Sequence, residues 1–242
     1  MDFDFTEDQD SLRDAVRRWV DKDYDFPRRH ASVKAGGFSR EAWDGIVGLG
    51  LTGLAVPEAH GGLGFGAVDA MVVMEELGRG IVMEPYAQAG LIAPTVLLQA
   101  SEAVQAQWLP KIAGGEAMVV LALQERGARY DLSKVAATVV DGKLTGHKSL
   151  VAVGDEADAF IVPARTDGGL ALFLVERSAS GVSTRPYSLQ DGSRAADVTF
   201  AASPATMLVG PDRGLAVLEL AVDVGIAALC AEGVGAMEKL IA

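Results

Sequence analysis

The sequence is poor in cysteine and in positive charge. Its 242 residues include a single cysteine, Cys230, which excludes an internal disulfide framework. Lysine and arginine number 21 against 33 aspartates and glutamates, which gives a net charge of −12. Because nucleic acids and anionic membranes bind proteins through clustered Lys and Arg, this balance argues against both kinds of partner.

Targeting and membrane signals are also missing. Residues 1–10 are acidic and lack the apolar segment of a signal peptide, so we expect a cytoplasmic protein. The longest apolar stretch, 214–231, is interrupted by Glu219 and Asp223, which argues against a membrane span.

No pattern of side chains indicates an active site built from protein groups alone. The histidines lack metal-ligand spacing, so we expect no metal site. The Ser-His-Asp order of a hydrolase and the paired carboxylates of a glycosidase are missing too. Any chemistry must therefore come from a cofactor.

About a hundred residues with helical periodicity open the chain. Thr6, with Gln9 three residues later, predicts a capping box and a helix over 7–22. Ser39 is placed to cap a second helix. The stretch 48–66 is too rich in glycine for a helix, and we expect a structured loop there. Further helical patterns follow at 68–80, 84–99 and 101–109.

Two prolines bear on the last two of these patterns. Pro94 is expected to kink the helix over 84–99, because proline removes a backbone donor and clashes with the preceding turn. Pro110 is expected to end the short helix that Ser101 caps.

Runs of β-forming residues fill the middle of the chain. An apolar run over 118–123 leads into a polar crossover over 124–133. Asp141-Gly142 predicts a hairpin, because a type I′ turn needs positive φ at both positions, and Thr145-Gly146 is expected to form another turn. Several short strands at this spacing predict a small antiparallel barrel or sandwich. Later strands are expected at 170–176, 183–188 and 195–200.

The pattern is helical again from Gly214 to Ala242, with no capping or stop signal at its end, which indicates a piece of a longer chain. Its apolar stripe needs a partner surface, so we expect a dimer or larger oligomer. The stripe consists of Leu215, Leu218, Val222, Ile226, Leu229, Val234 and Met237. The predicted fold is α+β and multi-domain: an all-α domain over 1–115, an antiparallel β-barrel domain over 116–212, and the first helix of a C-terminal helical bundle over 213–242.

Three N-terminal segments resemble the acyl-CoA dehydrogenase family: Val-Pro-Glu at 56–58, Gly-Gly-Leu-Gly at 61–64, and Met-Glu-Glu-Leu-Gly-Arg at 74–79. The order of helices and strands resembles this family over the whole chain. Residues 125–132 and 227–232 resemble the small subunit of pimeloyl-CoA dehydrogenase and related heteromeric enzymes.

This resemblance implies an oxidoreductase in which FAD carries the electrons. In the family a glutamate takes the α-proton of an acyl-CoA thioester, a hydride leaves the β-carbon for the flavin, and an electron-transfer flavoprotein reoxidises the FAD, as in the β-oxidation of fatty acids. The implied partners are an acyl-CoA, such as one of a dicarboxylic or ring-containing acid, an electron-transfer flavoprotein, and a second copy or another acyl-CoA dehydrogenase subunit.

Seven positions match cofactor contacts of the family. They are the strand-and-turn residues against the flavin ring, Leu121, Leu123 and Gln124; a Gly-Ser pair on the phosphate side, here Arg129 and Tyr130; and the tryptophan and threonine beside the ring, here Leu150 and Ala152. Losing the aromatic residue costs stacking of roughly 0.5–1.5 kcal/mol. Losing the threonine removes a side-chain hydrogen bond.

The family's catalytic glutamate, where it lies on the last helix, falls at Gly225, which cannot act as a base. The sequence therefore predicts no catalytic residue. Two functions stay open: a FAD-dependent acyl-CoA dehydrogenase subunit, or a non-catalytic partner subunit that shapes its neighbour's active site. A general acyl-CoA-binding module is a more distant third.

Overall fold

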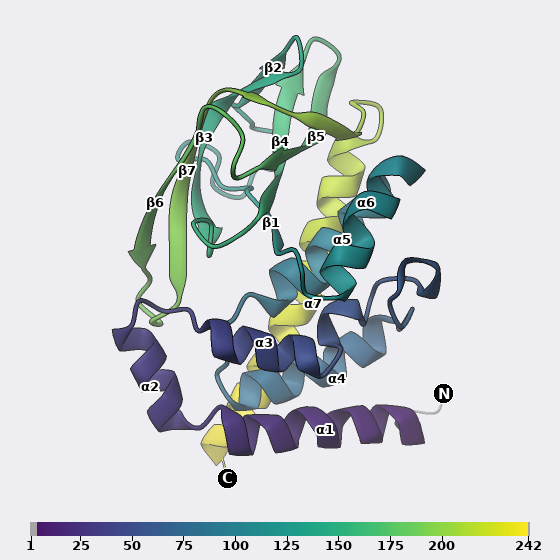
Figure 1. The fold of residues 1–242 in the computed structure, drawn as a ribbon, viewed down its shortest axis with the longest axis vertical. Coiled ribbons are helices and arrows are strands. Elements are labelled where there is room, and N and C mark those ends of the chain that lie inside the picture. The colour runs from purple at the N-terminus through teal and green to yellow at the C-terminus, as the bar shows by residue number, and fades with distance from the viewer. Residues whose placement is uncertain (1–3, 242) are drawn as a thin grey trace.

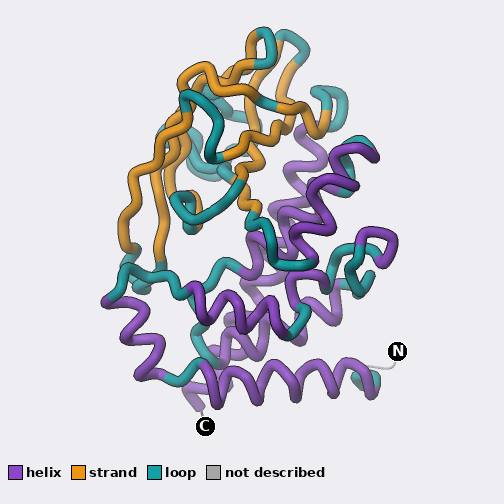
Figure 2. The backbone as a smooth tube through the Cα atoms, viewed as in Figure 1, coloured by secondary structure: helices purple, strands orange, loops and turns teal. Residues whose placement is uncertain are grey.

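The computed structural model describes residues 4–241 and has three parts, a helical body, a bent β-sheet and one long helix (Figures 1 and 2). The long helix, α7, begins beside the sheet and runs past the other helices to α1 (Figure 1). This arrangement confirms the predicted α+β architecture, with helices before and after a middle β region.

The elements have the following bounds. The helices are α1 Glu7–Asp23, α2 Phe26–Lys34, α3 Arg40–Gly48, η1 Leu51–Gly53, η2 Glu58–His60, α4 Ala67–Arg79, η3 Ala87–Ile92, α5 Ala93–Leu97, α6 Glu102–Ala113 and α7 Gly214–Ile241. The strands are β1 Val119–Leu121, β2 Thr138–Val140, β3 Lys143–Ala152, β4 Ala159–Thr166, β5 Gly169–Glu176, β6 Val182–Ser188, β7 Arg194–Pro204 and β8 Thr206–Val209.

Side-chain caps fix the first helices. Thr6 and Gln9 form the predicted capping box at the start of α1. The predicted cap of α3 is also present, since the Ala42 N–H donates to the Ser39 hydroxyl over 3.2 Å. The prediction missed α2, although Asp25 accepts from the Arg28 N–H at its N-terminus and a proline lies in its first turn.

The two prolines act differently from the prediction. Ahead of Pro94, η3 is a π-helix that runs directly into α5, so the wide turn accommodates the proline within a continuous helical segment. Pro110 does not end α6, which continues to Ala113. The carbonyl that loses its partner belongs to Ala106, which is exposed, so water can satisfy it.

The strands form one bent sheet with the order β6-β7-β3-β2-β4-β5-β8, and β1 pairs with β4. The predicted Asp141-Gly142 hairpin is confirmed: Val140 pairs with Lys143, and both turn residues have positive φ, 49° and 71°. The predicted Thr145-Gly146 turn is wrong, because both residues lie within β3 at a bulge. The pairing path is open between β6 and β8, and β1 and β2 pair with β4 in parallel, so the barrel is partly open and mixed.

The larger of two hydrophobic clusters joins the three parts. It includes Val16 of α1, Phe160 and Phe200 of the sheet, and Ala228 of α7, all at most 4% exposed. The two phenylalanine rings meet edge to face, with centroids 5.9 Å apart. Because packing crosses from part to part, the domain limits at 115/116 and 212/213 stay predictions.

The buried face of α7 is not the predicted one. Of the seven apolar residues in the predicted stripe, Leu218 alone is buried, whereas Ile226, Leu229 and Met237 are more than half exposed. The buried residues are mostly small: Gly214, Val217, Leu218, Ala221, Gly225, Ala228, Ala231 and Gly235. The prediction failed because the helix is apolar on every side, so its hydrophobic pattern does not single out a face.

Small residues bring the backbones of α4 and α7 into contact. A Cβ on Gly235 would overlap the carbonyl oxygen of Glu75, and a Cβ on Gly78 would overlap that of Glu232. No side chain fits at either glycine unless the helices separate. Length and composition alone would allow α7 to cross a membrane, but helices of protein cores pass the same test, so the absence of a membrane span stays a prediction.

A buried carboxylate joins α1 to α4. Glu76 is 2% exposed. Its Oε2 accepts from Arg17 Nε over 3.0 Å and from Arg79 Nε over 2.9 Å. Arg79 also donates to Asp21 over 2.9 Å. Burial alone would raise the pKa of Glu76, but the two guanidinium groups outweigh burial and hold it below its ordinary value.

Replacing Gly235 with alanine should lower the free energy of unfolding by about 1–3 kcal/mol, because the added methyl group forces α4 and α7 apart. Gly233→Ala is the matched control on the same helix, since its Cβ would meet no atom within 4 Å. It should stabilise the helix by up to about 1 kcal/mol through propensity. Urea denaturation measures both, and equal stability of the two variants would contradict the close contact.

Replacing Glu76 with glutamine should lower the free energy of unfolding at pH 7 by on the order of 3 kcal/mol, because two arginines lose a buried anionic partner. The pKa of Glu76 is depressed in the folded state. Its contribution is therefore full above the unfolded pKa of about 4.3 and is lost as the pH falls through the lower folded value.

Urea unfolding of wild type and variant between pH 7 and pH 3 measures this difference. The exposed Glu219→Gln on α7 is the control and should match wild type throughout. A deficit for Glu76→Gln that stays constant down to pH 3 would contradict the charge argument.

Candidate functional site

The polar crossover after β1 is held against β3 by a buried ion pair. Lys148, whose side chain is 0% exposed, donates from Nζ to Glu125 Oε1 over 2.6 Å. Glu125 also accepts the backbone N–H of Ala136 over 2.6 Å and of Ala137 over 3.2 Å. These bonds tie both ends of the loop 126–135 to the sheet.

Electrostatics favours the ionised form of Glu125. Burial would raise the pKa of Glu125, but the hydrogen bonds from Lys148 and from the Ala136 N–H outweigh it and lower the pKa. Burial also lowers the pKa of Lys148, an effect that the Glu125 carboxylate opposes. Removing either partner alone would leave a buried charge without compensation.

This pair brings three of the seven predicted cofactor positions together. The Leu123 carbonyl lies 3.5 Å from Lys148 Nζ, and the Gln124 carbonyl accepts from the Ser149 N–H over 2.8 Å. Leu150 follows directly on β3. Leu123, Gln124 and Leu150 therefore lie along the edge of β3 that β2 leaves unpaired beyond Thr145, where the crossover meets this strand.

Leu150 lies in a distorted part of β3. It falls within a register shift between Lys148 and Val151, has a φ of 56°, and is 56% exposed. Its N–H donates to the Tyr187 hydroxyl over 2.9 Å. Ala152 ends β3 and pairs with Ala195 of β7. The exposed leucine thus presents an apolar surface, while its backbone donor is already used.

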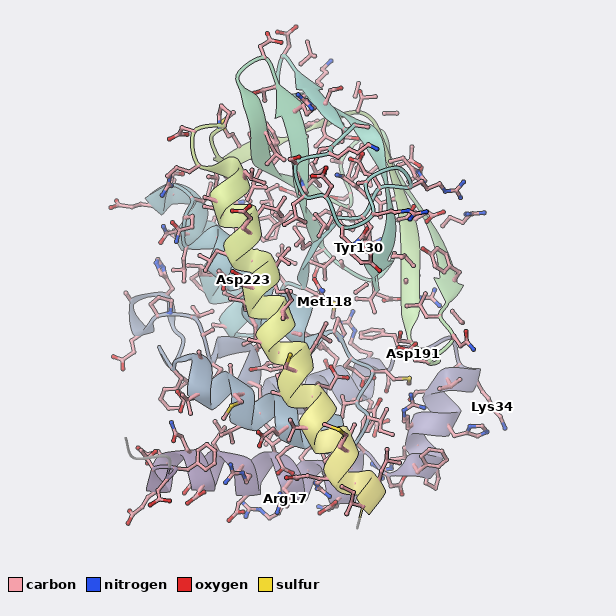
Figure 3. The ribbon with its side chains drawn as sticks, turned by 180° about the vertical axis from the view of Figure 1, so that it is seen from behind. Arg17, Lys34, Met118, Tyr130, Asp191 and Asp223 are labelled. Atoms are coloured by element: carbon pink, nitrogen blue, oxygen red, sulfur yellow. The ribbon has the colours of Figure 1, made fainter. Side chains whose placement is uncertain are left out.

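The remaining predicted positions, Leu121, Arg129 and Tyr130, differ from these residues in burial and in location. Leu121 is buried in β1, 8% exposed. Arg129 and Tyr130 belong to the turn of the crossover, Arg129 with a φ of 51°. Tyr130 is 96% exposed and labelled on the crossover in Figure 3. Its ring therefore fills no pocket of this chain.

The resemblance implies FAD, but the described residues do not fit a complete FAD site. Leu150 and Ala152 carry no polar side-chain atom, and Tyr187 already takes the Leu150 N–H. Tyr130 faces solvent. Leu150 can offer an apolar surface to a ring system, but Leu150 and Ala152 supply no side-chain donor at the two positions where the family has a tryptophan and a threonine.

The family's base position is also unsuited to chemistry. Gly225 is buried on α7, and a Cβ there would lie 3.0 Å from the Ile92 side chain. The carboxylates on the same helix, Glu219 and Asp223, are exposed, and Asp223 is labelled in Figure 3. Among residues 4–241, no group of three or more His, Cys, Asp or Glu residues could hold a metal ion.

An apolar cavity of about 430 Å³ lies against Val224, Ala227 and Ala228 of α7. It is bounded by α4, the η3–α5 segment and α7, together with the loop before α4. A cavity of this size and lining suits an apolar ligand group. Its lining includes Phe65, Met71, Leu91, Thr95, Val224 and Ala227.

Sequence reasoning missed the ion pair and the cavity. A lysine in an alternating strand indicates a solvent-facing position, and Lys148 carries no local signal of burial. The cavity is formed by segments more than a hundred residues apart, so no local pattern encodes it. Glu125 alone had a signal, as part of the crossover that resembles the family.

Residues 6–116 match the family described as acyl-CoA dehydrogenase, N-terminal domain. Acyl-CoA dehydrogenase FadE27 of Mycobacterium tuberculosis is 34% identical over 146 residues, which are 60% of this chain and 39% of that protein. The ChsE4-ChsE5 complex from Mycobacterium tuberculosis matches with a TM-score of 0.84 and 27% identity, over 99% of this chain and 66% of the matched one. A variant of the Tcur3481-Tcur3483 steroid ACAD, an acyl-CoA dehydrogenase, matches with a TM-score of 0.85 and 29% identity. The match covers 96% of this chain and 64% of the matched one.

The chain spans less than two thirds of the length of these relatives. Within that span the fold agrees with those of the solved structures. The family profile, the sequence relatives and the fold all lead to the same assignment, without fixing a subtype. The chain belongs to the acyl-CoA dehydrogenase family.

Proposed function

We propose that this chain is a subunit of a FAD-dependent acyl-CoA dehydrogenase that forms an α,β double bond in an acyl-CoA thioester and passes the electrons to an electron-transfer flavoprotein. The cytoplasmic location predicted from the sequence is part of the proposal, as is a role in fatty acid degradation. The observation that carries it is the apolar cavity, which lies between helices of a chain with this family's fold.

The cavity supports a bulky apolar acyl group as substrate. Its volume of about 430 Å³ falls within the range of small-molecule sites, about 300–1,000 Å³. Phe65, Met71 and Leu91 supply aromatic and aliphatic walls. A ring-containing acyl group fits this lining, and one of the similar solved structures is described as a steroid ACAD.

The subunit proposed here works within an assembly. Ile226, Leu229 and Met237 form an exposed apolar face on α7, more than half exposed in each case, and such a face favours burial against another surface. One of the similar structures is described as a complex of two proteins, ChsE4 and ChsE5. We therefore propose a hetero-oligomer of the kind to which the pimeloyl-CoA dehydrogenase small subunit belongs.

A second candidate function is that of a non-catalytic partner subunit. It is favoured by Gly225, which occupies the family's base position and has no side chain that could act as a base. It is also favoured by the missing donors around Leu150. In this case the chain would shape a neighbour's site and supply no reacting group.

Ala227→Leu distinguishes the two candidates, because Ala227 lines the cavity and is itself exposed on α7. In the complex of the whole protein with its partner, filling the cavity should raise KM for a ring-containing acyl-CoA about ten-fold and leave assembly unchanged. Ala216→Leu, exposed on the same helix outside the cavity, is the control and should match wild type. The measurement is acyl-CoA oxidation with an artificial electron acceptor.

An unchanged KM for Ala227→Leu in an active, assembled complex would contradict substrate binding by this chain and would favour the non-catalytic role. Absence of any acyl-CoA oxidation by the wild-type complex would contradict the proposed reaction itself.

A further inference from the structure

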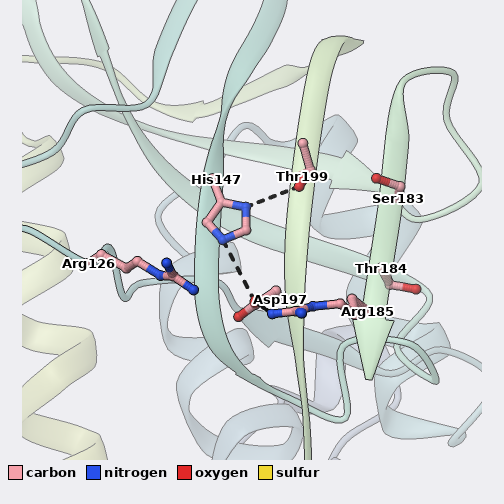
Figure 4. Close-up of a pocket in the computed structure, with 7 residues that line it drawn as sticks. All are labelled: Arg126, His147, Ser183, Thr184, Arg185, Asp197 and Thr199. Carbon is pink, nitrogen blue, oxygen red and sulfur yellow. Dashed lines mark hydrogen bonds and ion pairs between the residues drawn. The ribbon is translucent and has the colours of Figure 1, made fainter. Parts of the chain in front are cut away.

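The exposed face of β3, β7 and β6 carries a cavity of about 330 Å³ that the proposed function does not use (Figure 4). Every residue that lines it has a polar or charged side chain. Figure 4 shows Arg126 reaching toward the strands from the crossover, while the other groups come from the strands themselves. The residues concerned are Arg126, His147, Ser183, Arg185, Asp197 and Thr199.

Strand register sets these side chains in rows. Ser183 of β6 pairs with Thr199 of β7, and Thr199 pairs with His147 of β3. Two residues further along, Arg185 pairs with Asp197. Because side chains at alternate positions of a strand share a face, both rows point to the same side of the sheet.

The carboxylate in the cavity is already neutralised. Asp197 Oδ2 accepts from Arg185 over 2.8 Å, and Oδ1 accepts from the Tyr187 hydroxyl over 3.1 Å. The hydrogen bond from Arg185, with further support from Tyr187, lowers the pKa of Asp197, so this side chain is an anion with both oxygens in use.

Donors remain in excess around it. Arg185 uses one nitrogen for Asp197, and its side chain is 75% exposed, so its other N–H groups have no partner among residues 4–241. Arg126 has neither a hydrogen bond nor an ion pair within the described residues. His147 bonds to the Thr199 hydroxyl through Nδ1 over 3.0 Å, and its Nε2 lies 3.9 Å from Asp197.

We propose that this cavity binds a dianionic phosphate group, either the free ion or the phosphate of a small ester. Arg126 and Arg185 supply two guanidinium groups, against the single charge of Asp197, on a chain whose net charge is −12. A guanidinium group can donate two parallel N–H bonds to two phosphate oxygens. Such charge-assisted hydrogen bonds are stronger than hydrogen bonds between neutral groups.

The distribution of donors favours a tetrahedral anion over a planar carboxylate. One guanidinium group satisfies a carboxylate in its plane, whereas phosphate oxygens project in several directions. Here the donors come from several directions. Arg126 lies on the crossover and Arg185 on β6, and Ser183, Thr199 and His147 form a row across β6, β7 and β3. The cavity also exceeds the size of a phosphate ion, which leaves space for a small organic group.

Titration of the purified chain with inorganic phosphate, followed by ³¹P NMR at constant ionic strength, tests the proposal. Saturable binding is expected. Arg126→Ala should weaken it about ten-fold, the loss expected for one charge-assisted pair. Because Arg126 has no partner in the described residues, its removal should leave the fold intact, which circular dichroism checks.

Arg18→Ala is the matched control. Arg18 is exposed on α1 and also lacks a described ion pair, so its removal changes net charge equally. It should leave phosphate binding unchanged. A second titration with glycerol 3-phosphate distinguishes a phosphate ester from the free phosphate ion as ligand. Tighter binding of glycerol 3-phosphate than of inorganic phosphate assigns the site to esters, and equal binding assigns it to the free ion.

Three results would overturn the proposal: no saturable binding of phosphate by the wild-type chain, equal weakening by Arg126→Ala and Arg18→Ala, or acetate binding as tightly as phosphate. None of them bears on acyl-CoA oxidation, so this site stands or falls independently of the proposed function.

Discussion

The close contact between α4 and α7 is the constraint on which the rest of the structure depends. Gly78 and Gly235 let each helix backbone touch the other, where any Cβ would overlap a carbonyl oxygen. This contact fixes the rotation of α7. It places Gly225 against Ile92, sets Val224 and Ala227 on the apolar cavity, and turns Ile226 and Leu229 outward.

The chain combines an intact fold with an incomplete site. The Glu125–Lys148 pair still clamps the crossover onto β3, in the position where the family carries its flavin contacts. The clamp can persist without a cofactor, because breaking a buried ion pair from one side costs several kcal/mol. Of the side chains at the family's cofactor positions, by contrast, Leu150 and Ala152 offer no hydrogen bonds, and Tyr130 faces solvent.

Local signals in the sequence predicted local structure well. Thr6 and Ser39 cap helices as expected, since a cap depends on residues three positions apart. Asp141-Gly142 forms its predicted turn because the turn depends on two adjacent residues that tolerate positive φ. The buried face of α7 could not be predicted, because an apolar helix gives no periodic signal and the deciding partners, Glu75 and Gly78, lie in another helix.

The candidate site was less predictable than the fold. Resemblance located Leu123, Gln124 and Leu150, which the structure brings to one edge, but their contacts depend on Lys148, whose burial has no local signal. The left-handed backbone of Leu150 is equally invisible in sequence, since leucine rarely adopts positive φ. Tertiary contacts decide both features.

The central claim is that this chain has the acyl-CoA dehydrogenase fold without a complete flavin site of its own. Equilibrium dialysis of FAD against the purified chain, read by flavin absorbance, tests it most directly. The account predicts no stoichiometric binding at FAD concentrations up to about 100 μM, equivalent to less than roughly 5.5 kcal/mol of binding free energy. One tightly bound FAD per chain, in the absence of any other subunit, would contradict it.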